Sequence, residues 1–240
     1  MIRRYLAFDL ETAKILPEHV SDLLAHRPLG ICCAAAVASD RPDATIWHGK
    51  AADGSPSPSM SAFEVVGLVH DLQGFVDQGY TLLTWNGLQF DLDVLAEESG
   101  LLSECARLAA AHVDMMFHVV CALGHRLAMD NAARGMGLEG KTPGVTGCQA
   151  PILWAGGRHA ETIEYNVRDA RTTLDVAAAS ESRRALRWVT RKGRISELPL
   201  PEGWLDVKHA RLLAQPDTSW MTEPPRREDY FRWFPPEQRG

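Results

Sequence analysis

Two carboxylates, Asp9 and Glu11, lie two positions apart in an apolar run over residues 5–11. The run predicts a β-strand, in which alternate side chains share a face. Asp9 and Glu11 would then project side by side, roughly 6–7 Å apart, while Leu6, Phe8 and Leu10 point the other way, into the core. Neighbouring acids are costly to bury without a counter-charge, which a divalent cation would supply. Because 31 of the 240 residues are acidic, two acids at this spacing can also arise by chance. The alternative is therefore two solvated acids at the end of a strand.

A second segment, residues 80–91, carries a further carboxylate after a predicted turn. Leu82 to Trp85 indicates a buried strand, and Asn86-Gly87 is typical of a turn. Asp91 then lies near the first turn of a predicted helix. Taken alone, Asp91 is as well explained as a helix N-cap.

The third segment is a predicted long helix that begins at about Glu161. Tyr165 and Asp169 are four residues apart, so both side chains lie on one face of that helix, a turn from each other. By itself this pair also fits an ordinary surface contact.

Taken together, the three segments resemble the DEDD superfamily of 3′–5′ exonucleases, in its tyrosine subclass. The family pattern is D-x-E on the first strand, N-x-x-x-[FY]-D after a later strand, and Y-x-x-x-D on a C-terminal helix. The histidine subclass would need a histidine where this chain has Glu164. The resemblance covers residues 1 to about 190. This part of the chain is similar to the exonuclease domain of family-B DNA polymerases, here as a free-standing protein.

The resemblance implies an α/β, ribonuclease H-like fold with a five-stranded mixed sheet flanked by helices. It also implies two divalent cations, Mg²⁺ or Mn²⁺, which agrees with hard oxygen donors. The implied metal ligands are Asp9, Glu11, Asp91 and Asp169, and Tyr165 would orient a metal-bound water.

The same resemblance suggests contacts with the terminal nucleotide from Thr12, Asn86 and Leu10, although Leu10 also fits a place in the core. We therefore expect a metal-dependent 3′–5′ exonuclease that hydrolyses phosphodiester bonds at the 3′ end of single-stranded nucleic acid, with DNA preferred to RNA. One alternative is an exoribonuclease trimming RNA or short oligonucleotides. A non-catalytic nucleic-acid-binding module is another.

Composition agrees with a cytoplasmic enzyme. No apolar run is long enough to span a bilayer, and the N-terminal residues lead straight into the first predicted strand, so no membrane association or leader is expected. Five cysteines without C-x-x-C spacing indicate buried thiols in a reducing compartment. The net charge of −6 argues against bulk electrostatic binding of duplex nucleic acid.

The remaining predictions concern the elements around these motifs. Strands are expected over residues 31–39 and 44–47, a helix over 60–76, helical segments within 112–140, and a loop over 140–151. Asp114 could cap the apolar stretch that follows it. Six basic residues between Arg183 and Arg194 indicate a solvated helix end and hairpin, or a rim that tracks phosphates.

From about Leu198 the chain becomes rich in proline and tryptophan. A disordered tail rarely carries three tryptophans, so we expect an extension packed on the nuclease domain. The predicted domains are therefore residues 1–197, the nuclease, and residues 198–240, the extension.

Overall fold

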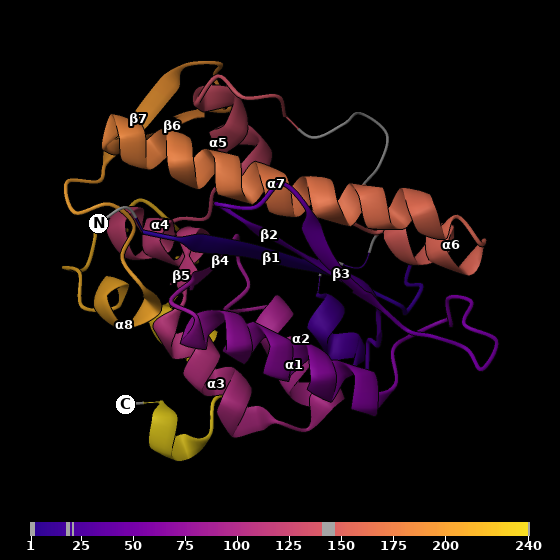
Figure 1. The fold of residues 1–240 in the computed structure, drawn as a ribbon. Coiled ribbons are helices and arrows are strands. Elements are labelled where there is room, and N and C mark those ends of the chain that lie inside the picture. Colours follow the sequence, from indigo (N-terminus) through magenta and orange to yellow (C-terminus); the bar gives the residue numbers. More distant parts are fainter. Residues whose placement is uncertain (1–2, 18–19, 21, 141–146, 240) are drawn as a thin grey trace.

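A five-stranded mixed sheet forms the centre of the structure, with helices on both of its faces (Figure 1). This computed structural model describes residues 3–17, 20, 22–140 and 147–239. The strands lie in the order β3-β2-β1-β4-β5, and a separate hairpin is formed by β6 and β7. Their bounds are β1 Tyr5–Thr12, β2 Ile31–Ala38, β3 Ala44–His48, β4 Thr81–Thr84, β5 Val113–Asp114, β6 Ala185–Val189 and β7 Ile195–Pro199.

The sheet topology brings the ends of three strands to one edge. β2 pairs antiparallel with β1 and with β3, whereas β1, β4 and β5 run parallel. Because parallel strands end at the same edge of a sheet, the segments that leave β1, β4 and β5 meet there. The predicted α/β architecture with a five-stranded mixed sheet flanked by helices is confirmed.

Helices cover the two faces of the sheet unequally. In Figure 1 the long α7 crosses one face, and α1, α2 and α3 lie on the other. The α-helices are α1 Ala62–Asp77, α2 Asp91–Ser99, α3 Leu102–Ala111, α4 Met115–Leu123, α5 Met129–Gly135, α6 Ala150–Ala155, α7 His159–Arg183 and α8 Val207–Ala210. The 3₁₀ helices are η1 Leu23–His26, η2 Arg227–Phe231 and η3 Pro236–Gln238.

β1 separates two hydrophobic clusters because its side chains alternate. Leu6, Phe8 and Leu10 pack into the cluster that α1, α2 and α3 share. Tyr5 and Ala7 belong to the cluster on the α7 side. The predicted inward direction of the apolar residues is therefore confirmed, and the carboxylates of β1 share the α7 side of the sheet.

The predicted elements agree with the structure, with small shifts at their ends. The helix expected over 60–76 begins at Ala62, because Ser61 and Glu64 form a reciprocal capping box before it. α6 begins at Ala150, inside the loop predicted over 140–151, whose residues 141–146 lie outside the described residues. The hairpin expected after the long helix is β6–β7.

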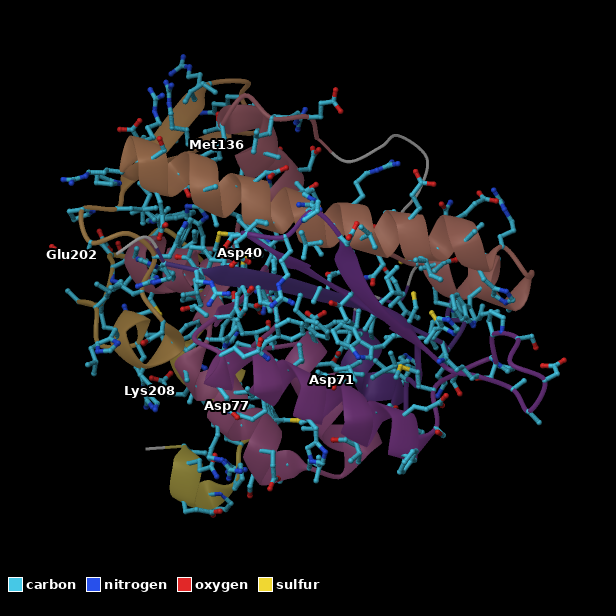
Figure 2. The ribbon with its side chains drawn as sticks, viewed as in Figure 1. Asp40, Asp71, Asp77, Met136, Glu202 and Lys208 are labelled. Atoms are coloured by element: carbon cyan, nitrogen blue, oxygen red, sulfur yellow. The ribbon has the colours of Figure 1, made fainter. Side chains whose placement is uncertain are left out.

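The hairpin packs on α5. Met136, labelled in Figure 2, directly follows α5, and its sulfur accepts the backbone N–H of Arg187 at 3.2 Å. A Cβ on Gly135 would lie 2.2 Å from the Cα of Trp188, so the close approach of helix and hairpin requires glycine at that position.

Residues after β7 pack against the rest of the chain through large aromatic side chains. Trp204, Tyr230 and Phe234 are almost completely buried. The indole N–H of Trp204 donates to Ser180 Oγ at 2.9 Å, and that of Trp233 donates to the carbonyl of Leu88 at 2.8 Å. The predicted boundary after residue 197 falls within β7, and the division into two domains stays a prediction.

Four cysteines, Cys32, Cys33, Cys105 and Cys121, are free and buried. Cys148 is free and exposed, so the prediction of a buried thiol is wrong at that position. Its place just before α6, outside the three hydrophobic clusters, agrees with the exposure. Within the described ranges, no helix combines the length and apolar character that crossing a bilayer requires.

Candidate active site

Asp9 and Glu11 lie near the end of β1. Glu11 is 6% exposed and Asp9 is half-buried. Opposite them on β2 are Cys33 and Ala35, whose small side chains leave room beside the carboxylates. The pairing of β1 with β2 becomes irregular immediately after Glu11, so Thr12 follows the site at a bend in the strand, half-buried.

The carboxylate of Asp9 is held from the opposite element. Asn166 of α7 donates its Nδ2 to Asp9 Oδ2 at 2.7 Å. Asn166 is fully buried, and its Oδ1 has no hydrogen-bond partner among the described residues. This contact joins β1 to α7 at the point where the predicted third motif begins.

Tyr165 and Asp169 project from α7 towards the same place. Both are buried, one helical turn apart, as the spacing predicts. Burial raises the pKa of the Tyr165 hydroxyl above its usual range, and the carboxylates of Asp169, Glu11 and Asp9 raise it further. The structure thus brings the tyrosine and three of the predicted carboxylates into one electrostatic environment.

Asp91 reaches the same strand from the other side. It is the first residue of α2 and is 5% exposed, and its Oδ1 accepts the backbone N–H of Leu10 at 3.1 Å. Burial raises the pKa of Asp91 to about 7, although the Leu10 N–H acts in the opposite direction. The N-cap of α2 is Phe90, and no side chain of a described residue caps this helix, so the simple capping explanation for Asp91 is wrong.

The turn before Asp91 is built around a carboxylate from β5. Asp114 accepts the backbone N–H groups of Asn86 at 3.1 Å and Leu88 at 2.8 Å. Asn86 has a φ of +76°, a conformation that asparagine tolerates better than most residues. A Cβ on Gly87 would lie 2.6 Å from the side chain of Thr84, so only glycine fits beside that residue.

Asp114 also begins α4, because it accepts the N–H of Phe117 at 2.9 Å as the N-cap. Its capping role is therefore confirmed. Since its carboxylate oxygens accept three backbone N–H groups, Asp114 positions the turn that carries Asn86.

The residues predicted to contact substrate occupy different settings. Asn86 is half-buried, with an Oδ1 that has no hydrogen-bond partner among the described residues. Leu10 is buried in the core cluster. The substrate contacts of Thr12, Leu10 and Asn86 stay predictions.

Sequence reasoning missed Asn166. Its signal lies in the buried stripe of α7, where Thr162, Tyr165, Asn166, Asp169 and Thr173 replace the apolar residues expected on a packed helix face. Several polar side chains on a buried face indicate a site rather than a core.

A sequence model of the RNase H superfamily matches residues 64–179. The chain has an RNase H-like fold. The matched range includes Asp91 and Asp169 and begins after β1. The match supports nuclease activity on nucleic acid. No curated protein matches the chain significantly.

Nucleases of this superfamily generally use divalent metal ions, and the donor set suits them. Asp9, Glu11, Asp91 and Asp169 offer only hard carboxylate oxygens. Three of these carboxylates raise the pKa of Tyr165, so their negative charges lie close to its hydroxyl. Bound cations would offset that negative charge. Among the described residues, no three His, Cys, Asp or Glu side chains already stand in metal-binding geometry.

Proposed function

We propose that this chain is a metal-dependent 3′–5′ exonuclease that hydrolyses single-stranded nucleic acid from its 3′ end, DNA in preference to RNA. The observation that carries the proposal is the gathering of Asp9, Glu11 and Asp169 around the Tyr165 hydroxyl. Asp91 is anchored to the same strand through Leu10. Such an accumulation of buried negative charge is unfavourable for folding and suits a site that binds cations.

The four carboxylates would hold two Mg²⁺ or Mn²⁺ ions, which would supply an activated water and charge stabilisation for phosphodiester hydrolysis. Asn166 keeps Asp9 oriented through the hydrogen bond to Oδ2. The Leu10 N–H does the same for Asp91.

Tyr165 acts as a hydrogen-bond donor in this proposal. Its raised pKa keeps the phenol protonated at neutral pH, so it is a poor general base. The hydroxyl donates to Asp169 and would orient the attacking water beside it. The preference for DNA rests on the resemblance to the exonuclease domain of family-B polymerases.

The test is degradation of a 5′-labelled single-stranded DNA oligonucleotide with Mg²⁺ or Mn²⁺. We expect a ladder of shortened, labelled products that disappears with EDTA and with Asp9→Asn. Asp175→Asn is the matched control, because Asp175 is exposed on the same helix as Asp169. It should leave the ladder unchanged.

A parallel RNA oligonucleotide of the same sequence decides the sugar preference. Faster trimming of RNA would replace the DNA proposal with an exoribonuclease. Absence of cleavage of both substrates with either metal would overturn the enzyme and favour a binding module.

A further inference from the structure

An open cavity of about 850 Å³ lies between the β6–β7 hairpin, the segment that follows α4, and the C-terminal extension. Its lining includes aromatic and basic side chains from all three parts of the chain: His125, Arg126, Trp188, Arg191 and Trp220. We call this the aromatic–arginine pocket. It is separate from the carboxylates of the candidate active site.

The aromatic rings of the pocket are arranged around His125. Its ring centroid lies 6.5 Å from that of Trp188 and 6.3 Å from that of Trp220, both edge to face. Trp188 is buried and forms a wall, whereas Trp220 is 67% exposed. An exposed indole beside a histidine offers a flat surface on which an unpaired base can stack.

The charges of the pocket favour an anion. Arg126 and Arg191 line it together with one acid, Glu223. This local excess of positive charge departs from the chain as a whole, whose net charge is −6. Two guanidinium groups beside aromatic faces suit the alternation of phosphates and bases along a single strand.

The basic stretch between Arg183 and Arg194 divides into two parts. Arg183 and Arg187 lie 3.9 and 3.4 Å from the single carboxylate of Glu197, so one negative charge partly offsets their two positive charges. Arg191, Lys192 and Arg194, around the hairpin turn, are exposed, and none of them forms an ion pair with another described residue. Arg184, which follows α7, is also exposed and forms no ion pair with another described residue, but of these unpaired basic residues Arg191 alone lines the pocket.

A chain of contacts connects the pocket with the candidate active site. Arg126 donates to Gln89 Oε1 at 2.8 Å, within the segment that leads to Asp91. Trp85, directly after β4, donates its indole N–H to the carbonyl of Leu127 at 3.2 Å. The pocket thus begins beside the turn that carries Asn86.

We infer that the aromatic–arginine pocket binds the single-stranded nucleic acid upstream of the 3′ end that enters the active site. The inference rests on the proposed function for its direction along the strand. A duplex is disfavoured because paired bases have both faces covered by their neighbours and cannot stack on Trp220.

The first experiment measures binding without cleavage. Full-length Asp9→Asn protein is titrated into 5′-fluorescein-labelled dT12, and Kd is read from fluorescence anisotropy. Adding Trp220→Ala should weaken binding about tenfold, the usual cost of losing one stacked base. Adding Arg191→Gln should lower the slope of log Kd against log salt by about 0.7, the value for one phosphate contact.

Matched controls are Phe63→Ala, because Phe63 is 86% exposed on α1, and Arg107→Gln on α3. Both should bind dT12 like the parent. Equal affinities for the pocket variants and these controls would overturn the inference. Equal weakening of binding to a blunt duplex would overturn its restriction to single strands.

The second experiment uses the active chain and separates the inference from the proposed function. With Trp220→Ala, KM for dT12 should rise about tenfold, kcat should stay unchanged, and hydrolysis of a dinucleotide should not change. An equal loss of kcat/KM for dT12 and for the dinucleotide would contradict the inference about the pocket and would leave the proposed exonuclease activity unaffected. If the wild type cleaves neither substrate, the proposed exonuclease activity is wrong. The binding experiment then still tests whether the pocket binds single-stranded nucleic acid.

Discussion

The candidate active site and the anchor of the C-terminal extension both bury polar groups, but they satisfy them differently. In the anchor, the guanidinium of Arg227 is buried and donates to the carbonyls of Arg211, Leu213, Ala214 and Cys121. In the site, Asp9, Glu11 and Asp169 act together on one tyrosine, and all of them raise its pKa.

The difference separates groups that hold the fold from groups that act in chemistry. A buried cation that meets several carbonyl oxygens lowers its own cost of desolvation and fixes a long segment in place. Buried carboxylates that gather near one another have the opposite effect, because each raises the cost of charging its neighbours. Such an arrangement is retained where a ligand of opposite charge completes it.

The largest expected effect is that of Asp169→Asn. Losing one carboxylate that holds a cation should reduce kcat/KM for a DNA oligonucleotide by roughly 10³-fold, or several kcal/mol. The free energy of unfolding in urea should not decrease, because the substitution removes one of three negative charges that gather near Tyr165, and the amide oxygen can still accept from the Tyr165 hydroxyl. Asp175→Asn, exposed on the same helix, should change neither quantity. A large loss of stability with Asp169→Asn would contradict the division between site and anchor.

The second prediction concerns the pH dependence of stability. It tests another contact that holds the C-terminal extension, made by His118 of α4 with Leu205 and Trp204. Burial lowers the pKa of His118 to about 4. The neutral ring accepts the N–H of Leu205 at its Nδ1, 3.2 Å away, and packs edge to face on Trp204. Below the unfolded pKa of about 6.5 the unfolded chain binds a proton that the folded chain does not.

The stability that His118 contributes is therefore complete above about pH 6.5 and is lost as the pH falls towards 4. By pH 5 the loss should be about 2 kcal/mol. His118→Gln keeps an acceptor for Leu205 but does not titrate, so urea unfolding of this variant should depend less on pH between 7 and 5. Identical pH profiles for the two proteins would show that His118 is not the group responsible.

The parts of the site that follow from short-range patterns could be predicted from the sequence. Alternation along β1 assigned Asp9 and Glu11 to one face, and the four-residue spacing assigned Tyr165 and Asp169 to another. Asn86-Gly87 predicted the turn after β4, since the pair tolerates the backbone that a tight turn requires.

The parts that depend on contacts between distant segments could not be predicted. β5 has only two residues, too few for any periodic signal, and yet its Asp114 organises the turn after β4. Asp91 looks like a helix cap until β1 is placed beside it and the N–H of Leu10 becomes its partner. Neither relation leaves a trace in the local sequence.

A smaller effect on activity than that of Asp169→Asn, and the sharpest test of where the site ends, is expected for Asn166→Ala. Asn166 contacts the proposed metal-holding carboxylate Asp9 at 2.7 Å without itself offering a charge. Removing a side chain that orients such a carboxylate typically costs about 10–100-fold in metal affinity or activity. The loss should therefore appear as a higher concentration of Mg²⁺ needed for half-maximal activity, and saturating metal should restore much of the rate. Thr172→Ala, on the same helix but outside its buried stripe, is the control. A fall in rate that no metal concentration reverses would instead place Asn166 among the residues that contact the substrate, and the boundary of the catalytic site would extend along α7 beyond its carboxylates.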